Sequence, residues 1–559
     1  MKKKYVLTLA VGLLALTLSS CQYFMQISPD GVAFFPGLNS STGGHTIVDV
    51  STPPAGDTTP IKAAYTYKDY IQNNVYNFSM TPSTGTASLL IIPVWFNDST
   101  TFISEAKKES VRQDIEKAYF GTNEETGWRS VKTYYEEESL GELTLNGKVS
   151  EWYEINTNYD YYRMDEPTSD SGAPHTSALV EEATNWYFNT HTSDFRRNYD
   201  HNGDGYLDGV VIIYAAPDLQ ALNKDNDKTY ANLWAYCFWI QKSDSAHKST
   251  TSPGVNAFFW ASYDYMYGDD VANARTGGRY GSGDTKKCHL DTHTYIHEMG
   301  HMFGLEDYYD YSTNGRNQKG YQPAGGFSMQ DHNVGGHDPF SSYALGWGKA
   351  YLPNKTTNID LKPFSTSGEM IILNPNNGGR NSPFDEYLIL EYYTPQGLNE
   401  FDVVNQYMKS YGKSYPNATL EYGIRLWHVD ARLLYRTRLE SSWNAGNVTT
   451  DPTTASGKVT LMMSNSYDDG SCEYISVLGP SYANYNVLQM IRNSSTATYK
   501  PEDYLNSATL FKANDFFSMD KYSKQFVNGD KLNSNINLGF SFTVNACNKN
   551  YASISIEKL

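Results

Sequence analysis

Residues 297–307 read HEMGHMFGLED, which places two histidines four positions apart with a glutamate directly after the first. In an α-helix, positions i and i+4 lie on one face, so His297 and His301 can direct their imidazoles at one metal ion. Glu298 projects from the adjacent surface, where it can hold and deprotonate a metal-bound water. The stretch therefore predicts a zinc hydrolase that cleaves peptide bonds, with Glu298 as the catalytic base.

The residues around this motif have the profile of a buried helix from Thr292 to Phe303. Its apolar and aromatic members are Tyr295, Ile296, Met299, Met302 and Phe303. Burying two histidines and a glutamate among them without partners would cost several kcal/mol, and one bound cation satisfies all three. The alternative is a surface helix with two solvated histidines, which these apolar neighbours disfavour.

A catalytic zinc takes three protein ligands and keeps one position open, so a further ligand must follow the helix. Gly304 can adopt a positive φ angle and end the helix sharply, which turns the next residues back towards the metal. Asp307 occupies the position at which the extended HExxHxxGxxH pattern has its third histidine. We predict Asp307 as the third ligand, with Glu306 or a residue from farther along the chain as alternatives.

Downstream of the zinc motif, residues 325–331 read GGFSMQD and place a methionine in a glycine-led turn. This turn resembles the Met-turn of metzincins, in which a thioether packs beneath the ligating histidines without binding the metal. Met329 is predicted to have this role.

Several segments together resemble the immune inhibitor A-like family of bacterial metalloproteases. They are SVKTYYEEESLG at 130–141, the acidic loop at 200–208, the zinc motif with DYYD at 307–310, the turn at 326–331 and PFSSYALGW at 339–347. The resemblance covers roughly residues 86–350 and, less sharply, 385–430. It implies a secreted or surface-exposed zinc endopeptidase with structural calcium and protein or peptide substrates. The turn departs from the family, because Phe-Ser-Met-Gln stands where relatives usually carry an acid or a second methionine.

The acidic loop DHNGDGYLD at residues 200–208 independently suggests a second metal, calcium. Its expected ligands are Asp200, Asn202, Asp204, Tyr206 through its carbonyl, and Asp208 directly or through water. Gly205 falls at the sixth position, where a calcium loop turns sharply. The twelfth position is Val211 instead of glutamate, so the loop is not an EF-hand, and it leads into a predicted buried strand. The alternative is an acidic Asx/Gly turn without metal.

The N-terminus has the features of a bacterial export signal. Lysines at positions 2–4 precede an apolar run from Tyr5 to Leu18, which is too short for a membrane span. LSSC at residues 18–21 resembles a lipobox, in which Cys21 is lipidated and becomes the first mature residue. We predict an exported lipoprotein, anchored at the cell surface or outer membrane by its acyl chains or released into the medium. The alternative is an ordinary signal peptide whose last residues include a cysteine.

Composition narrows the choice of partners. The formal net charge of −18 disfavours nucleic acid, because phosphates would repel the chain. We expect a monomer that meets a membrane only through the N-terminal lipid anchor. Four cysteines follow the signal, at Cys237, Cys288, Cys472 and Cys547, and their number permits two disulfides or none.

The 559 residues divide into a signal peptide at 1–21, a Ser/Thr/Pro-rich tether or N-terminal extension at 22–85, a catalytic domain at 86–350 and a C-terminal domain at 351–559. The catalytic domain mixes strands and helices around the zinc helix, which predicts a zincin-like α+β fold. Its expected strands are 87–96, 210–216, 232–240 and 257–264, with others near 143 and 152, and its expected helices are 104–119, 132–138, 177–188, 292–303 and 338–345.

After Tyr351, short alternating runs separated by Gly, Asn, Pro and Ser predict a β-sandwich or β-barrel. Examples are 370–373, 386–393, 423–429 and 459–463. His428 and Asp430 lie on one face of such a strand, where a buried hydrogen-bonded pair is favoured over a metal site or a part in the catalytic cleft.

Two functions from other classes fit parts of the sequence. One is a surface adhesin or glycan-binding lipoprotein on a degenerate protease fold, and the intact His297, Glu298 and His301 argue against it. The other is a scaffold in which both metals only stabilise the fold, which an open fourth zinc position would exclude. The endopeptidase is the function we expect, with Tyr309 or Tyr343 as a candidate for stabilising the oxyanion.

Overall fold

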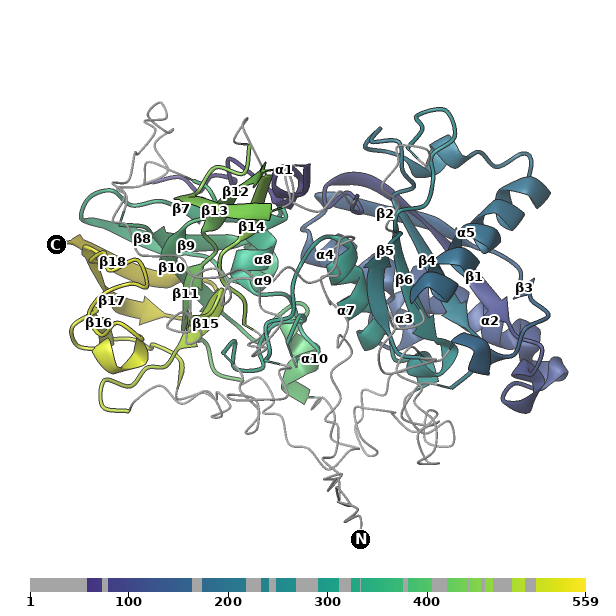
Figure 1. Ribbon diagram of the computed structural model, residues 1–559. Helices are drawn as coiled ribbons and strands as arrows, with labels where there is room; N and C mark the ends of the chain where they lie inside the picture. Colours follow the sequence, from purple (N-terminus) through teal and green to yellow (C-terminus); the bar gives the residue numbers. More distant parts are fainter. Residues whose placement is uncertain are drawn as a thin grey trace, which may run out of the picture.

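The computed structural model of the chain describes fourteen segments that form two lobes (Figure 1). They are residues 58–72, 79–162, 173–217, 233–240, 248–267, 290–310, 323–331, 333–375, 381–404, 420–439, 442–453, 458–465, 485–497 and 509–559. The predicted signal peptide with Cys21, most of the predicted tether, Cys288 and Cys472 lie outside these segments. Within them, none of the helices combines the length and apolar character that crossing a bilayer requires.

The N-terminal lobe is built on a six-stranded sheet in the order β2-β1-β4-β6-β5, with β3 also paired to β1. The strands are β1 (Gly85–Trp95), β2 (Leu143–Val149), β3 (Tyr153–Glu154), β4 (Gly209–Tyr214), β5 (Tyr236–Trp239) and β6 (Ala257–Ser262). Only β5, at one edge, runs antiparallel to its neighbour. The apolar run predicted as a strand at 87–96 becomes an inner strand that is buried on both faces.

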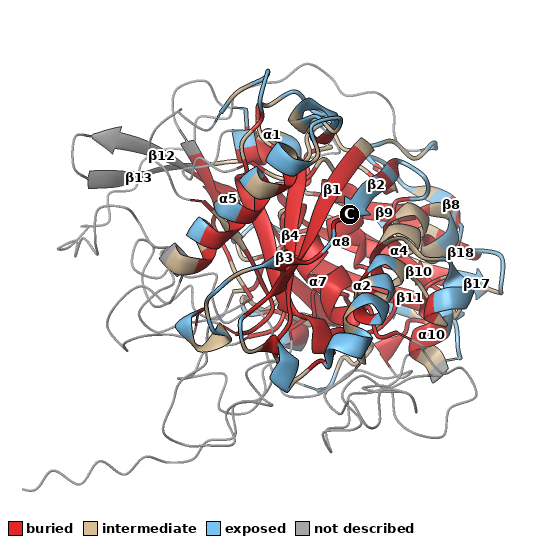
Figure 2. Ribbon diagram, turned by 90° about the vertical axis from the view of Figure 1, so that its right-hand side faces the viewer, coloured by how far each residue is buried: buried red, intermediate tan, exposed pale blue. Residues whose placement is uncertain are grey.

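Helices cover both faces of this sheet (Figure 2). The helices of this part of the chain are α1 (Tyr67–Gln72), α2 (Glu105–Phe120), α3 (Asn123–Thr126), α4 (Val131–Glu138), α5 (Ala173–Thr190) and α7 (His293–Met302). Alternate residues of β1 enter two different cores, as the two-residue period of a strand requires. Leu89 and Ile91 pack with residues of α2, α4 and α7, whereas Leu90 and Ile92 pack with residues of α5 such as Val180.

The C-terminal lobe is a β-sandwich. One sheet has the order β15-β11-β10-β9-β7 and the other β16-β17-β18-β8. Its strands are β7 (Lys349–Tyr351), β8 (Thr357–Leu361), β9 (Glu369–Leu373), β10 (Glu386–Tyr393), β11 (Gly423–Asp430), β15 (Leu488–Ile491), β16 (Phe516–Phe517), β17 (Phe540–Cys547) and β18 (Ala552–Lys558). Apolar residues of both sheets, for example Leu390 and Ile554, form the core between them.

A third, small sheet of β12 (Leu433–Leu439), β13 (Ser442–Thr449) and β14 (Lys458–Leu461) flanks this sandwich. The described α-helices of this part of the chain are the short α8 (Pro339–Ala344), α9 (Phe364–Ser367) and α10 (Asn399–Val404). The α+β class with a β-rich C-terminal lobe, expected from the sequence, is thereby confirmed.

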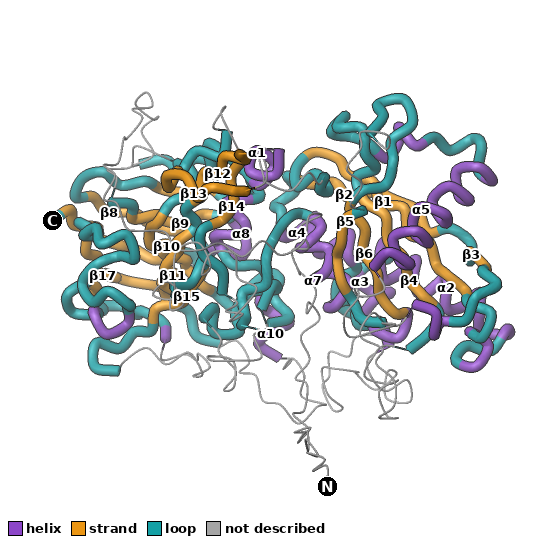
Figure 3. Tube along the Cα trace, viewed as in Figure 1, coloured by secondary structure: helices purple, strands orange, loops and turns teal. Residues whose placement is uncertain are grey.

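The two lobes share one hydrophobic core. Tyr387, Ile389 and Trp427 on the outer face of the β10–β11 sheet belong to the same cluster as Met299 and Met302 of α7. The helix with the zinc motif therefore lies where the lobes meet, as the tube drawing shows (Figure 3).

Two segments differ from the domain boundaries expected from composition. Strand β7, at the end of the predicted catalytic domain, pairs with β9 and so belongs to the C-terminal sheet. Residues 58–72, within the predicted tether or N-terminal extension, pack against the folded lobes. Ile61 bridges to Ala350, Lys62 Nζ donates to the Trp347 carbonyl at 2.6 Å, and Tyr67 is buried.

Candidate metal centre

Helix α7 is positioned by contacts on every side, and all ten of its residues are buried. Tyr295 Oη donates to the Ser262 carbonyl at the end of β6, at 2.9 Å. Tyr135 Oη of α4 donates to the Ile296 carbonyl at 2.5 Å. Gly300 has a steric role, because a Cβ there would lie 2.2 Å from Gln330 Oε1. The helix is thus fixed between the sheet, α4 and the loop that follows it.

His297, His301 and Asp307 converge on one point. The Nε2 atoms of His297 and His301 lie 3.1 Å and 3.4 Å from Asp307 Oδ1. The two rings have centroids 5.0 Å apart and are nearly perpendicular, at 85°. All three side chains are buried, and they are the one group of three potential metal-binding His, Cys, Asp or Glu side chains found among the described residues.

Backbone carbonyls fix which ring nitrogen of each histidine faces this point. His297 Nδ1 lies 2.8 Å from the Met329 carbonyl, and His301 Nδ1 lies 2.7 Å from the Leu305 carbonyl. A carbonyl oxygen only accepts hydrogen bonds, so both Nδ1 atoms carry the proton. The Nε2 atoms are then left to face Asp307, as in metal sites whose ligand tautomers are set by an outer hydrogen bond.

Gly304 produces the turn that brings Asp307 back to the helix. Its φ angle is +102°, and its N–H donates to the His301 carbonyl at 2.9 Å. A Cβ at this position would also collide with Met80, at 2.0 Å from its Cε. Asp307, and not the alternative Glu306, reaches the histidines. Burial and repulsion from Asp307 raise the pKa of Glu306 to about 7.

The donor set fits a bound cation. Both carboxylate oxygens of Asp307 are buried and have no hydrogen-bond partner. An ionised carboxylate that faces two imidazole lone pairs is repulsive unless a positive charge lies between them. Two nitrogens and one oxygen leave a tetrahedral ion one open position, which is the arrangement of catalytic zinc.

Glu298 is fully buried on α7, next to His297 in the chain. After burial itself, its negative charge contributes to raising the pKa values of Tyr119, Tyr135 and Cys237. The carboxylate therefore lies in apolar surroundings near these three residues, where its interaction with other charges is strong. Among the described residues, neither the buried Cys237 nor the half-buried Cys547 forms a disulfide bond.

Met329 lies in the turn below the histidines, fully buried, and its carbonyl is the acceptor for His297. The turn is closed by Asp331, whose Oδ2 accepts the Gly326 N–H at 2.8 Å. Gln330, which the sequence did not single out, places Nε2 3.4 Å from both ring nitrogens of His301. The turn thus contacts both histidines through polar groups.

In the predicted calcium loop, the acidic side chains accept hydrogen bonds from backbone N–H groups of the loop itself. Asp200 accepts the N–H groups of Asp204 and Gly205 at 3.1 Å each, and Asp204 accepts that of Tyr206 at 2.9 Å. Gly205 has a φ angle of +89°, as the predicted sharp turn requires. These contacts form an Asx-type turn, and calcium binding by the loop stays a prediction. Burial raises the pKa of Asp204 above its usual range.

Asp208, the last predicted ligand of this loop, is turned into the protein. Its Oδ2 lies 2.7 Å from His201 Nδ1 and accepts the Ser88 N–H of β1 at 2.8 Å. Burial raises its pKa to about 6. The Asp208 side chain therefore connects the loop to strand β1 of the central sheet.

His428 and Asp430 do not bond to each other, although both are buried and hydrogen-bonded. His428 Nε2 lies 2.9 Å from Glu386 Oε1, and Asp430 forms two hydrogen bonds with Arg432 at 2.7 and 2.9 Å. The predicted pair is thus replaced by two separate pairs. Sequence alone could not show this, because Glu386 lies on the neighbouring strand β10.

Comparisons with known proteins agree with this site. Residues 97–329 match the family model described as "Immune inhibitor A peptidase M6, catalytic domain". This range contains Glu298 and the three converging residues His297, His301 and Asp307. The pre-pro-metalloprotease PrtV of Vibrio cholerae serotype O1, in strains M66-2 and ATCC 39315 / El Tor Inaba N16961, is 26% identical over 285 residues. That alignment covers 46% of this chain and 27% of PrtV, so the chain spans about a quarter of these curated relatives.

Among solved structures, catalytically inactive OgpA from Akkermansia muciniphila, crystallised with an O-glycopeptide substrate, is 12% identical. The comparison covers 65% of this chain and 93% of that one, with a TM-score of 0.19, which is too low to support any conclusion. The family match, in contrast, confirms the resemblance that the sequence motifs predicted.

Proposed function

We propose that the protein is a zinc-dependent endopeptidase acting on extracellular proteins, and the match of residues 97–329 to the catalytic-domain model of the immune inhibitor A peptidases supports this proposal. The observation that carries the proposal is the convergence of two imidazole Nε2 atoms on Asp307, at 3.1 and 3.4 Å. Zinc is favoured over harder cations because two of the three donors are nitrogens.

The proposal gives each residue of the centre a role. His297, His301 and Asp307 would hold the metal, which when bound would polarise the scissile carbonyl and acidify water. Glu298 would accept the proton of the attacking water and pass it to the leaving amine. Its apolar surroundings would strengthen its interaction with positive charge.

Of the two tyrosines considered for the oxyanion, Tyr309 is the better placed. Its ring centroid is 6.5 Å from that of His297. Tyr343 Oη instead donates to the Asn381 carbonyl at 3.2 Å, so this hydroxyl is already used in a structural contact.

The decisive experiment separates metal binding from proton transfer. We expect the purified protein to cleave casein or a peptide library, to lose this activity with a zinc chelator and to regain it with added zinc. Glu298→Gln should lower kcat/KM by about 100- to 10,000-fold while zinc content stays at the parent level, because a base is lost and no ligand is. Cleavage at the parent rate by this variant would exclude Glu298 as the base.

We also propose one structural calcium ion in the loop at residues 200–208, supported by the alternation of oxygen side chains around Gly205.

From the sequence of residues 1–21 we propose that the protein is exported as a monomeric lipoprotein, anchored through Cys21. Labelling of expressing cells with radioactive palmitate tests the anchor. Incorporation should be lost in Cys21→Ser, and incorporation into that variant would contradict lipidation of Cys21.

A further inference from the structure

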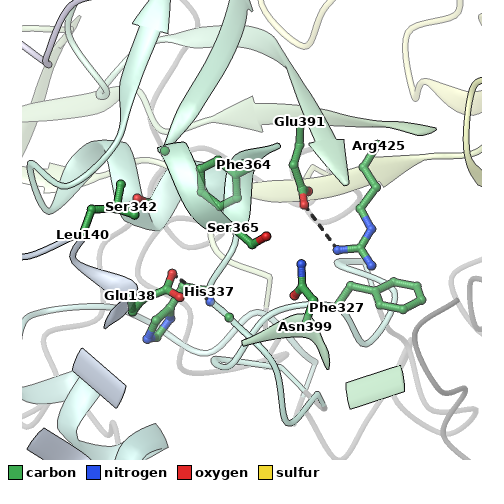
Figure 4. A pocket seen from close by; sticks show the side chains of 12 residues that line it. Glu138, Leu140, Phe327, His337, Ser342, Phe364, Ser365, Glu391, Asn399 and Arg425 are labelled. Atoms are coloured by element: carbon green, nitrogen blue, oxygen red, sulfur yellow. Dashed lines mark hydrogen bonds and ion pairs between the residues drawn. The ribbon is translucent and has the colours of Figure 1, made fainter. Parts of the chain in front are cut away.

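The two lobes enclose a small pocket (Figure 4). Glu138 and His337 line one side of it, and Glu391 and Arg425 line the other. Its volume of about 10 Å³ leaves room for about one water molecule, so no substrate group fits there. The contacts that reach the metal-binding turn come instead from residues that precede the catalytic domain in the sequence.

These residues form an N-terminal segment, defined as residues 58–72 and 79–84. The segment precedes residues 97–329, the part of the chain that matches the catalytic-domain model. Its helix α1 lies between the two lobes (Figure 1). Ile61 of the segment and Ala350 of β7 exchange two backbone hydrogen bonds, at 2.9 and 2.8 Å, which fix the segment to the C-terminal lobe. The segment is therefore part of the folded protein although it lies outside the matched domain.

The other end of the segment is fixed to the N-terminal lobe. The Ser79 N–H donates to Asn256 Oδ1 at 2.8 Å, directly before β6. The hydroxyl of Thr81, which is buried, donates to the Asp208 carbonyl at 2.6 Å, directly before β4. Met80 lies between these two anchored residues, so the central sheet determines its backbone position.

This anchored stretch contacts the end of the metal-binding helix and the glycine that follows it. The Thr81 N–H donates at 2.9 Å to the carbonyl of Met302, the last residue of α7. That carbonyl is one of the four at a helix C-terminus that have no partner within the helix. Met80 packs on Gly304, because a Cβ there would lie 2.0 Å from its Cε and 2.8 Å from its Sδ. Tyr67 lies against the same glycine, with Cδ1 3.3 Å from that Cβ position.

The turn that begins at Gly304 supplies two of the groups that arrange the metal centre. The Leu305 carbonyl lies 2.7 Å from His301 Nδ1, and Asp307 places Oδ1 close to the Nε2 atoms of both histidines. Gly304 has a φ angle of +102° and no side chain, so its own conformational preferences restrict the turn little. Neighbouring contacts must therefore hold it, and a displacement of Gly304 would move both the carbonyl and the carboxylate.

We propose that Met80 and Tyr67 are positioning residues for the metal centre, because they hold the turn at Gly304 from which Asp307 returns to the histidines. The inference rests on the proposed zinc-dependent function and places part of the support for the metal outside the catalytic domain. It follows that both residues stay in the active protein, so a maturation step that removed the N-terminal segment would abolish zinc binding.

The test compares two substitutions in the full chain that remove the same number of heavy atoms from half-buried side chains of the segment. Met80→Ala removes the contact with Gly304, and Ile61→Ala is the control at the C-terminal lobe. The zinc dissociation constant, measured by chelator competition, should rise about 10- to 100-fold in Met80→Ala and stay at about the parent value in Ile61→Ala. Met80→Leu, which restores the apolar volume, should recover most of the affinity. Unchanged affinity in Met80→Ala, or an equal loss in both alanine variants, would overturn the proposal.

A second measurement does not depend on a bound metal. Hydrogen exchange followed by mass spectrometry reports local opening of the turn in the metal-free protein. The peptide that covers residues 303–309 should exchange about tenfold faster in Met80→Ala than in the parent, and at the parent rate in Ile61→Ala. Faster exchange in Met80→Ala of a protein that binds no zinc would contradict the zinc-dependent function and keep the positioning role. Zinc binding by the parent with unchanged exchange in Met80→Ala would contradict the positioning role and keep the function.

The composition of the active protein gives a third check. Mass spectrometry of zinc-bound, proteolytically active protein from expressing cells should find the peptides that contain Tyr67 and Met80. An active, zinc-bound species from which either residue is missing would overturn the proposal.

Discussion

The zinc motif at residues 297–307 and the acidic loop at residues 200–208 both predict a metal site from sequence, but their donor atoms are used differently. Both oxygens of Asp307 lack hydrogen-bond partners in a buried site. Asp200 uses both of its oxygens to accept backbone N–H groups at 3.1 Å. Backbone N–H groups thus already provide partners in the loop, whereas the zinc motif leaves its ionised acid to be satisfied by a cation. The spacing of polar residues therefore predicts both groups of donor atoms, whereas the hydrogen bonds distinguish a carboxylate without partners from one that already has them.

The largest expected effect comes from Asp307→Asn. The neutral amide removes the charge that faces His297 and His301, so zinc content should fall below one tenth of the parent value. Proteolytic kcat/KM should fall on the order of 1000-fold, since no metal is left to activate water. Elemental analysis and peptide cleavage measure the two effects. Full zinc content in this variant would show that Asp307 is not a ligand.

Glu138→Gln extends the comparison to a buried acid with no cation. The folded state keeps Glu138 protonated up to about pH 8, whereas in the unfolded chain this carboxyl ionises near the ordinary glutamate pKa of 4.5. Unfolding therefore releases a proton between these values, and this group's stabilising contribution is lost as the pH rises through that window. The variant should gain nothing at pH 4 and about 2–4 kcal/mol of unfolding free energy at pH 8. Denaturant unfolding at both pH values measures the gain, and an equal gain at both would contradict the raised pKa.

Gly300→Ala tests how tightly the zinc helix and the Met-turn are packed. The new methyl group would lie 2.2 Å from Gln330 Oε1, so Gln330 must move away from His301. We expect a loss of about 1–3 kcal/mol of unfolding free energy together with weaker zinc retention in a chelator competition. Unchanged stability and retention would show that the turn adapts without affecting the metal.

Asp204→Asn, the loop counterpart of Asp307→Asn, has the smallest expected effect. Its side-chain oxygen can still accept the Tyr206 N–H, so without calcium the cost should be about 1 kcal/mol or less. If the loop binds calcium, EGTA should lower the Tm of the parent and have no further effect on the variant. An equal, zero EGTA shift in both would show that the loop is held by hydrogen bonds alone.

Much of the fold could be predicted from local sequence. The run at residues 87–96 forms β1 because continuous apolar residues suit a strand that is buried on both faces. Asp338 caps α8 by accepting the Ser341 N–H at 2.9 Å, with a proline in the first turn, as its sequence suggested. The packing of residues 58–72 and the membership of β7 in the C-terminal sheet depend on distant partners, so composition could not reveal them.

The features of the metal site also divide into those that the sequence predicts and those that only the folded chain decides. Sequence by itself determined the pair His297 and His301, because a helix places residues i and i+4 on one face whatever surrounds it. It also indicated Asp307 through the glycine that ends the helix. Only the tertiary structure decided which nitrogens face the metal, because the Met329 carbonyl acts across 32 residues of sequence. It also decided that Glu138 and Arg425 line one pocket. Helical periodicity and turns are set by neighbouring residues, whereas hydrogen-bond partners and burial depend on segments that meet only when the whole chain is folded.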